Sequence, residues 1–315
     1  MLHTVWHNFC AYGAITSSSS SLKMEGKDMA RSTRVVFVAS ILWAFGLGAA
    51  SPVEASVVQV TPGSMGNWAF DNRDANGVVG ANPTASGSMV TGPATPPLGV
   101  GSANLATGNG TTGGDGASEL RTTGYAGDPL SSITALSYST YQTQNNGQQF
   151  PYLRLTISTT GIGPADDIVF FEPPYQTPTS GNPSLPNQGD TALNTWQTWN
   201  AFTGGWWDNQ TGALPCNANP GTGVQSLAFI EACYPNALIE DATSGLGAIG
   251  FDVGFASATD QFNGYVDNFT IGINSANTTF DFEPGAVPEP STISVLGLGL
   301  LALGLMRRKR RISLE

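Results

Sequence analysis

Positive charge and imidazole are nearly missing from most of this 315-residue chain. Between residues 56 and 286 the sequence contains no lysine and no histidine, and its three arginines face eighteen Asp and Glu residues, a formal charge of −15. Proteins bind nucleic acids through Lys and Arg side chains that neutralise phosphates. A region of this composition is therefore not expected to bind nucleic acid.

The missing histidines and lysines also remove most catalytic chemistry. Without imidazole or amine there is no base for a Ser–His, Cys–His or Ser–Lys nucleophile, and no zinc or copper site built on imidazole. Carboxylate chemistry survives, because glycosidases need only two carboxyl groups at a suitable separation. The candidate carboxyl groups belong to Asp166, Asp167, Glu172, Glu240 and Asp241. Adjacent Asp residues in loops rich in Gly and Pro are usually solvated, so we assign no catalytic residue and do not expect an enzyme.

Long charged side chains are scarce, because only 11% of the residues are Asp, Glu, Lys or Arg. Ordinary amphipathic helices need such residues on their solvent face, whereas strands do not. Apolar residues alternate with small or polar ones at 153–158, 249–255 and 269–273, and 168–171 is a short, wholly apolar run. Clusters of Gly, Pro, Asn and Ser separate these segments. The pattern predicts an all-β, two-sheet antiparallel β-sandwich over residues 56–286, of the jelly-roll or concanavalin-like type.

Two further segments refine this fold. Leu227, Ile230 and Tyr234 fall on one side of a helix, so we expect one short helix at about 224–234. Residues 81–116 have a loop-like composition and are expected to contain at most two strands. The block at 264–273 resembles the last long strand of exported jelly-roll domains, which often ends a carbohydrate-binding-like module.

The N-terminal part has the organisation of a secretory signal. A cationic stretch at 29–34 precedes an apolar run at 35–50, and Val53 and Ala55 supply small residues before a cleavage point. We predict a signal peptide over 29–55, with signal peptidase cutting between Ala55 and Ser56. An uncleaved anchor helix is the alternative, although the run is shorter than the roughly 20 residues needed to span a bilayer. Residues 1–28 are interpreted as a non-native or disordered extension, with translation beginning at Met24 or Met29.

The C-terminal part combines three features in a fixed order. Pro288, Glu289 and Pro290 precede an apolar segment at 291–306, and five cations follow it: Arg307, Arg308, Lys309, Arg310 and Arg311. A basic cluster after an apolar segment stops translocation and stays on the cytoplasmic side. As a helix the segment would reach about 24 Å at about 1.5 Å per residue, which is short of a hydrocarbon core of about 30 Å. We therefore expect a transmembrane helix that is only a transient inner-membrane anchor.

This end, over 287–315, resembles the PEP-CTERM sorting signal of Gram-negative bacteria. The resemblance implies that exosortase, a membrane-embedded cysteine protease, recognises Pro288, Glu289 and Pro290 and processes the chain there. The family is typical of bacteria that make exopolysaccharide, and it implies release to the cell surface or extracellular matrix. An ordinary tail anchor with two incidental prolines is the alternative.

Cysteine usage agrees with export. Cys10 precedes the signal peptide, which leaves Cys216 and Cys233 as an even pair in a chain bound for an oxidising compartment. We predict a disulfide between them. Metal thiolates are the alternative, but no other soft ligands accompany the pair.

Tryptophan is concentrated in one short stretch. Four of the five tryptophans between residues 56 and 286 lie within twelve residues: Trp196, Trp199, Trp206 and Trp207. Exposed indole faces stack on sugar rings, so Trp199, Trp206 and Trp207 are candidate glycan contacts. Large aromatic side chains are mostly buried, and the alternative is that at least two of these residues fill the core. Strand alternation places Trp206 and Trp207 on opposite faces.

Asp267 is the candidate metal ligand. Alternation places its carboxylate on the same face as Phe269, Ile271 and Ile273, where it needs a partner. With so few cations available, Ca²⁺ is a candidate counter-ion and the one candidate cofactor. The alternative is an Asp that accepts backbone N–H groups at a strand end.

These features together predict an exported protein of the cell surface or extracellular matrix that interacts with polysaccharide and has no enzymatic activity. One alternative is a structural or adhesive matrix protein without a specific glycan site. Another is a secreted glycoside hydrolase that uses carboxylates. The expected partners are exosortase, signal peptidase and exopolysaccharide.

Overall fold

The computed structural model describes residues 56–209, 216–242 and 245–285. The predicted signal peptide, its cleavage point after Ala55 and the sorting segment at 287–315 lie outside these residues. No helix within the described ranges is long and apolar enough to cross a membrane.

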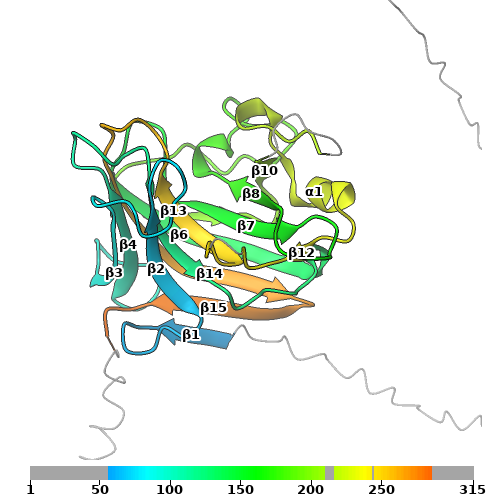
Figure 1. Ribbon diagram of the computed structural model, residues 1–315, viewed down its shortest axis with the longest axis horizontal. Helices are drawn as coiled ribbons and strands as arrows, with labels where there is room; N and C mark the ends of the chain where they lie inside the picture. Colours follow the sequence, from blue (N-terminus) through cyan, green and yellow to red (C-terminus); the bar gives the residue numbers. More distant parts are fainter. Residues whose placement is uncertain (1–55, 210–215, 243–244, 286–315) are drawn as a thin grey trace, which may run out of the picture. The chain divides into compact units, whose positions relative to one another are not determined.

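The described chain folds into two β-sheets, as the alternating sequence pattern predicts (Figure 1). The seven-stranded sheet contains β1 (Ser56–Val60), β3 (Ser86–Thr91), β4 (Gly101–Thr107), β6 (Ile133–Gln144), β9 (Gln197–Asn200), β14 (Phe262–Ile273) and β15 (Ala276–Phe282). The eight-stranded sheet contains β2 (Trp68–Arg73), β5 (Ala117–Thr122), β7 (Tyr152–Ser158), β8 (Asp167–Phe171), β10 (Gly205–Asp208), β11 (Gln225–Ser226), β12 (Leu238–Ile239) and β13 (Ile249–Gly254). The predicted strands at 153–158, 168–171, 249–255 and 269–273 are confirmed, and the segment 81–116 holds two strands, β3 and β4.

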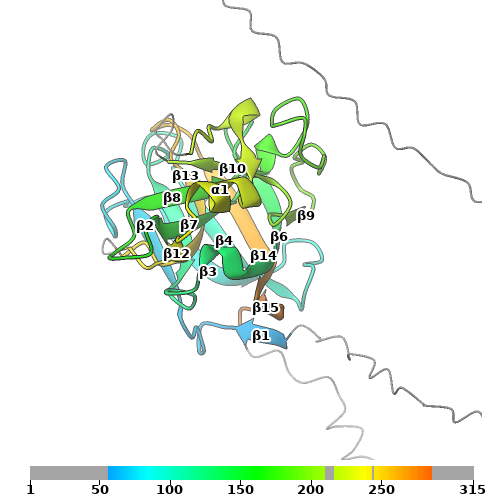
Figure 2. The same cartoon turned by 90° about the vertical axis from the view of Figure 1, so that its right-hand side faces the viewer.

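Strand β14 organises the seven-stranded sheet. It pairs with β6 along most of one side, while its other side pairs first with β4 and then with β15. The block at 264–273 therefore lies in a long central strand, and β15 follows it. The pair β1 and β15 is parallel, which departs from the wholly antiparallel sandwich that the sequence predicts. Figure 2 shows these two strands side by side at one edge of the fold.

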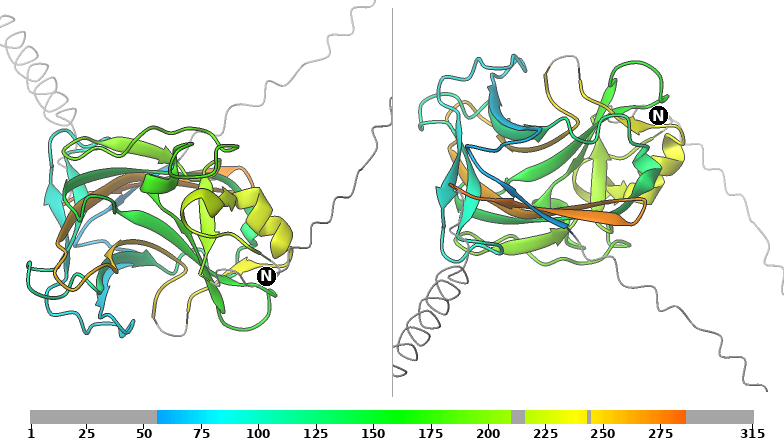
Figure 3. Two further views of the ribbon diagram at one scale, coloured as in Figure 1. Left: turned by 90° about the horizontal axis from the view of Figure 1, so that it is seen from above. Right: turned by 90° about the horizontal axis from the view of Figure 1, so that it is seen from below.

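The eight-stranded sheet runs in the order β11-β10-β8-β7-β13-β5-β2, with β12 added beside β7. Every pairing among its described strands is antiparallel. The predicted short helix is present as α1 (Leu227–Cys233), and the side chain of Ser226 caps its N-terminus by accepting the N–H of Phe229 at 3.1 Å. Figure 3 shows α1, drawn in yellow, at one end of the sandwich. Three single-turn helices, η1 (Leu130–Ser132), η2 (Pro173–Tyr175) and η3 (Gly221–Gly223), complete the elements.

The core lies between the inner faces of the two sheets. Trp68 of β2 is its aromatic centre, because its ring meets those of Phe251, Phe269, Phe280 and Phe282 at centroid distances between 5.1 and 6.2 Å. Burying a side chain of this size contributes about 1.5–3 kcal/mol relative to leaving it in water. Packing between the inner faces therefore fixes how the two sheets stack. The side chains on the outer faces do not take part in this packing.

The predicted disulfide between Cys216 and Cys233 is confirmed, with the two Cα atoms 5.4 Å apart. It joins the segment before η3 to the last residue of α1. The bond therefore ties the helix to the chain that leads into it.

Reduction of this disulfide is expected to destabilise the protein measurably. It spans a sequence separation of 17 residues, and closing such a loop contributes about 3 kcal/mol on the loop-entropy model. Because each kcal/mol shifts the melting temperature of a domain of this size by about 2–4 °C, reductant should lower it by about 6–12 °C. A variant with Cys216→Ala and Cys233→Ala should melt near the reduced protein and ignore reductant. An unchanged melting temperature on reduction of the unmodified chain would contradict this prediction.

Candidate functional site

The outer face of the eight-stranded sheet carries the side chains that alternate with the core residues. Register pairs Arg154 of β7 with Phe170 of β8, and Phe170 with Trp207 of β10, so these three share that face. On the other side of β7, Tyr152 pairs with Asp252 of β13 in the same way. The alternation of apolar and polar residues at 153–158 is typical of a strand with one buried face, but every residue of β7 is buried, because charged partners cover its outer face as well.

Two arginines and two carboxylates form a buried network on this face. Arg154 donates from Nε to Asp252 at 2.8 Å and from Nη2 to Glu119 at 3.4 Å. Arg73 contacts the same two carboxylates, donating to Asp252 at 3.0 Å and to Glu119 from its Nε. Burial raises the pKa of Glu119 to about 7, the charge of Asp252 adds to the rise, and the two arginines oppose it. A side chain at Gly250 would meet the guanidinium of Arg154 at 2.6 Å, which explains a glycine in the middle of β13.

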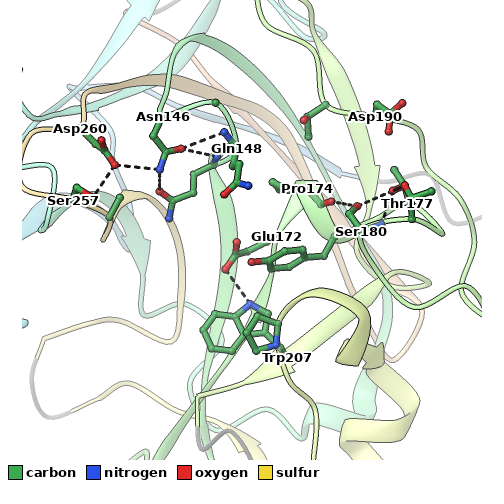
Figure 4. Close-up of a pocket in the computed structure, with 17 residues that line it drawn as sticks. Asn146, Gln148, Glu172, Pro174, Thr177, Ser180, Asp190, Trp207, Ser257 and Asp260 are labelled. Carbon is green, nitrogen blue, oxygen red and sulfur yellow. Dashed lines mark hydrogen bonds between the residues drawn. The ribbon is translucent and has the colours of Figure 1, made fainter.

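A cleft of about 680 Å³ opens beside this network (Figure 4). Its walls come from the loop between β6 and β7, the turn η2 after β8, strand β10 and the loop between β13 and β14. The side chains that matter chemically are Asn146, Gln148, Glu172, Tyr175, Asp190, Trp207 and Asp260. They combine aromatic faces with carboxamides and carboxylates, and none of the residues that line the cleft is Lys, Arg or His.

Trp207 and Glu172 form the base of the cleft. The indole Nε1 of Trp207 donates to Glu172 Oε1 at 3.0 Å. The ring of Phe170 stacks on the indole, with the two ring centroids 4.4 Å apart. Trp207 is thereby held in one orientation while remaining half-buried. Burial raises the pKa of Glu172 to about 7, although the hydrogen bond from Trp207 lowers it.

A second cavity of about 310 Å³ adjoins the cleft, because both are lined by Gln149, Glu172 and Trp207. It is walled by Arg73, Tyr152, Phe170 and Phe255, and the guanidinium of Arg73 lies 4.7 Å from the ring centroid of Phe255. Arg73 of the buried charge network therefore lines the second cavity, and Trp207 lines both this cavity and the cleft.

Hydrogen bonds fix one wall of the cleft. Asn146 Nδ2 donates to Gln149 Oε1 at 2.9 Å and to Asp260 Oδ2 at 3.2 Å, and the backbone N–H of Ser257 donates to the same Asp260 oxygen at 3.1 Å. Two loops that are more than a hundred residues apart in the sequence are joined in this way.

The predicted glycan contacts divide between core and cleft. Trp199 and Trp206 are fully buried, and their indole N–H groups donate to Thr140 and to the carbonyl of Ala201. The structure therefore corrects these two assignments, because no ligand can reach their faces. Trp207 points the opposite way from Trp206, as alternation predicts, and lines the cleft. Trp196 is half-buried, donates to the carbonyl of Pro93 at 2.9 Å, and lies outside the cleft.

The sequence motifs do not predict most of the residues that line the cleft. Of the candidate carboxyl groups, only Glu172 lines it, and Asp166, Asp167, Glu240 and Asp241 lie elsewhere. Tyr175 and the carboxamide run at 145–149 were not singled out as functional. Their signals are a Pro-Pro-Tyr sequence directly after a buried strand, and four Asn and Gln residues around one glycine.

Asp267 does not lie on the apolar face that alternation predicts. A β-bulge between Asp267 and Thr270 adds one residue to β14 opposite β6, with Asn268 in the left-handed region at a φ of 54°. The shift puts Asp267 on the same face as Thr270, opposite Phe269. Its oxygens accept the N–H of Leu98 at 2.9 Å and of Phe282 at 3.3 Å, which is the alternative role considered for it. Within the described ranges, no group of three or more His, Cys, Asp or Glu side chains is arranged to hold a metal ion, and calcium binding stays a prediction.

The fold and the cleft define a two-sheet β-sandwich protein with a polar, aromatic-lined site on one sheet. Residues 286–311 match the family described as the PEP-CTERM protein-sorting motif. The chain therefore carries a PEP-CTERM sorting signal, which implies an exported protein that passes through a membrane-anchored precursor and has exosortase as its processing partner.

Comparison with solved structures finds a similarity to the family 11 carbohydrate-binding module of the cellulosomal cellulase Lic26A-Cel5E of Clostridium thermocellum. The identity is 14% and the TM-score is 0.34, with coverage of 66% of this chain and 88% of that module. No curated protein matches the sequence.

Breaking the buried charge network is expected to be far more damaging than breaking an exposed ion pair. Arg154→Leu leaves two buried carboxylates, Glu119 and Asp252, with Arg73 as their one remaining cationic partner, which should lower the free energy of unfolding by about 3–5 kcal/mol. Arg121→Leu is the matched control, because Arg121 contacts Asp71 at 3.1 Å with both side chains partly exposed, and its loss should be about 0–1 kcal/mol. Urea unfolding of both variants measures the difference, and equal losses would disprove the special role of the network.

Stability is also expected to fall as the pH rises toward neutrality. Burial raises the pKa of Asp267 to about 7, whereas an unfolded Asp titrates near about 3.9. The protonated form is thus favoured by folding, so its stabilisation is complete below about pH 4 and is lost as the pH rises through about 7. The melting temperature should be higher at pH 5 than at pH 8, and the difference should shrink in Asp267→Asn.

An identical pH dependence in the variant would contradict this account of Asp267. Adding Ca²⁺ at pH 8 extends the measurement to the predicted metal role. A rise in melting temperature that disappears in Asp267→Asn would support calcium binding at this residue, and no rise would count against it.

Proposed function

We propose that this protein is an exported component of the cell surface or extracellular matrix that binds polysaccharide in the cleft around Trp207, without catalysing a reaction. The observation that carries the proposal is the composition of the cleft. Trp207 and Tyr175 offer aromatic faces, and Gln148 and Asp190 offer planar polar groups beside them. Export through the PEP-CTERM signal brings the domain to the place where polysaccharide occurs.

The chemistry of sugars suits this arrangement. A pyranose ring has an apolar face that stacks on an aromatic ring, and a rim of hydroxyl groups that both donate and accept hydrogen bonds. Carboxamide side chains both donate and accept, so they match such a rim. Because Glu172 and Phe170 hold Trp207 in place before the ligand arrives, little side-chain entropy is lost on binding.

Glycoside hydrolysis is a second candidate function of the cleft. Glu172, Asp190 and Asp260 line one cleft, and a carboxyl group with a raised pKa is what a general acid needs near neutral pH. Incubation with polysaccharide and measurement of released reducing ends separates the two functions. Release that is lost in Glu172→Gln would favour the hydrolase, and binding without release supports the proposed function.

Replacement of Trp207 by Ala is the direct test of binding. We expect Trp207→Ala to reduce affinity for a bound polysaccharide by about tenfold or more, since aromatic contacts of this kind contribute about 0.5–1.5 kcal/mol beyond the area they bury. Trp196→Ala is the matched control, because Trp196 is a half-buried tryptophan outside the cleft. A glycan array followed by calorimetry on the full-length chain, kept in mild detergent, gives both affinities.

The two variants also define the contrary result. If both bind as well as the unmodified chain, the ligand does not use this cleft. If no polysaccharide binds at millimolar sugar, the protein is better described by the structural or adhesive alternative.

A further inference from the structure

The cations of the described domain are all occupied by carboxylates outside the cleft. Arg73 and Arg154 contact Glu119 and Asp252, and Arg121 contacts Asp71. No lysine or histidine is present between residues 56 and 286. The carboxyl groups that line the cleft therefore have no cationic partner among the described residues.

Three carboxyl groups line the cleft from three separate segments. Glu172 accepts the indole N–H of Trp207, and Asp260 accepts two neutral donors from its own wall of the cleft. Asp190 is exposed, and within the described residues its carboxylate accepts no hydrogen bond from the protein. In the view of Figure 4, Asp190 and Asp260 lie on opposite sides of the cleft with Glu172 between them.

This spacing does not suit a single metal ion. Within the described ranges, no three Asp, Glu, His or Cys side chains come close enough to one point to hold a cation together. Separate carboxylates along a cleft instead match a ligand whose positive charges are spaced along a chain. An acidic polymer would meet the opposite situation, because like charges repel at short range and the region 56–286 carries a formal charge of −15.

We propose that the ligand of this cleft is a polysaccharide that bears free amino groups, with the ammonium groups paired to Asp190 and Asp260 while Trp207 and Tyr175 stack on the sugar rings. The inference rests on the proposed function and specifies the class of glycan. It predicts discrimination between two polymers that differ only in acetylation of the amine, because acetylation removes the positive charge and keeps the ring.

The test compares short β-linked glucosamine oligomers, the same oligomers fully N-acetylated, and uronic acid oligomers of equal length. Binding to the full-length chain is measured by calorimetry at slightly acidic pH, where the amines are charged. We expect the amine form to bind about tenfold more tightly than the acetylated form, a difference of about 1.4 kcal/mol, and the uronic acid form to bind least. At about 1 M salt, where charges are screened beyond about 3 Å, the preference should largely disappear.

Variants separate the cleft from general attraction to an acidic protein. Asp190→Asn with Asp260→Asn should remove most of the tenfold preference for the amine, because Asn keeps the size of Asp without its charge. Asp128→Asn with Glu231→Gln removes the same charge outside the cleft and should leave the preference unchanged.

The outcomes distinguish the two proposals. Equal affinity for the two forms, tighter binding of uronic acid, or equal loss in both double variants would overturn the amine proposal and leave polysaccharide binding intact. Saturable Ca²⁺ binding that Asp190→Asn with Asp260→Asn abolishes, without an amine preference, would overturn it in favour of a metal. Failure of every glycan, including those of a broad array, would overturn both the amine proposal and the proposed function.

Discussion

The ion network of Arg73, Glu119, Arg154 and Asp252 is the constraint around which this domain is organised. Its members come from β2, β5, β7 and β13, four strands of one sheet, and Arg154, Glu119 and Asp252 are fully buried. Charges removed from water in this way are tolerated only when each has a partner, and removing one partner strands another. Two of the three cations available between residues 56 and 286 are used here. The outer face of the eight-stranded sheet is consequently rigid, polar and closely fitted, which gives the adjoining cavities a fixed wall.

The same shortage of cations decides how the other acids are accommodated. Asp267 is buried and relies on backbone N–H groups from Leu98 and Phe282, at the place where β14 changes partner from β4 to β15. Asp167 lies against Asp208, and burial with that neighbouring charge raises the pKa of Asp167 to about 7. Asp208 is itself fully buried and accepts the hydroxyl of Tyr234 at 2.7 Å. Neutral donors therefore satisfy the buried acids that the arginines do not reach.

The sequence predicts the fold better than the site, and particular residues explain why. Alternation of apolar residues and the pairing of two cysteines are local signals, so the sheets, α1 and the disulfide follow from them. Alternation also separates Trp206 from Trp207, but it cannot say which face is the core. For Asp267 the prediction from alternation is wrong because of the bulge at Asn268. One inserted residue moves every side chain beyond it to the opposite face of the sheet. The cleft is formed by loops from distant parts of the chain, and the local periodicity of the sequence does not indicate which loops come together.

The cleft and the last strand of the described domain belong to different sheets. The last residues fixed in the domain are those of β15 and Glu283, whose backbone N–H donates to Val60 and whose side chain accepts the N–H groups of Val100 and Gly101. Only four residues in sequence lie between Glu283 and Pro288, the first residue of the Pro-Glu-Pro motif. The chain therefore leaves the described domain from the seven-stranded sheet, whereas the cleft belongs to the outer face of the eight-stranded sheet.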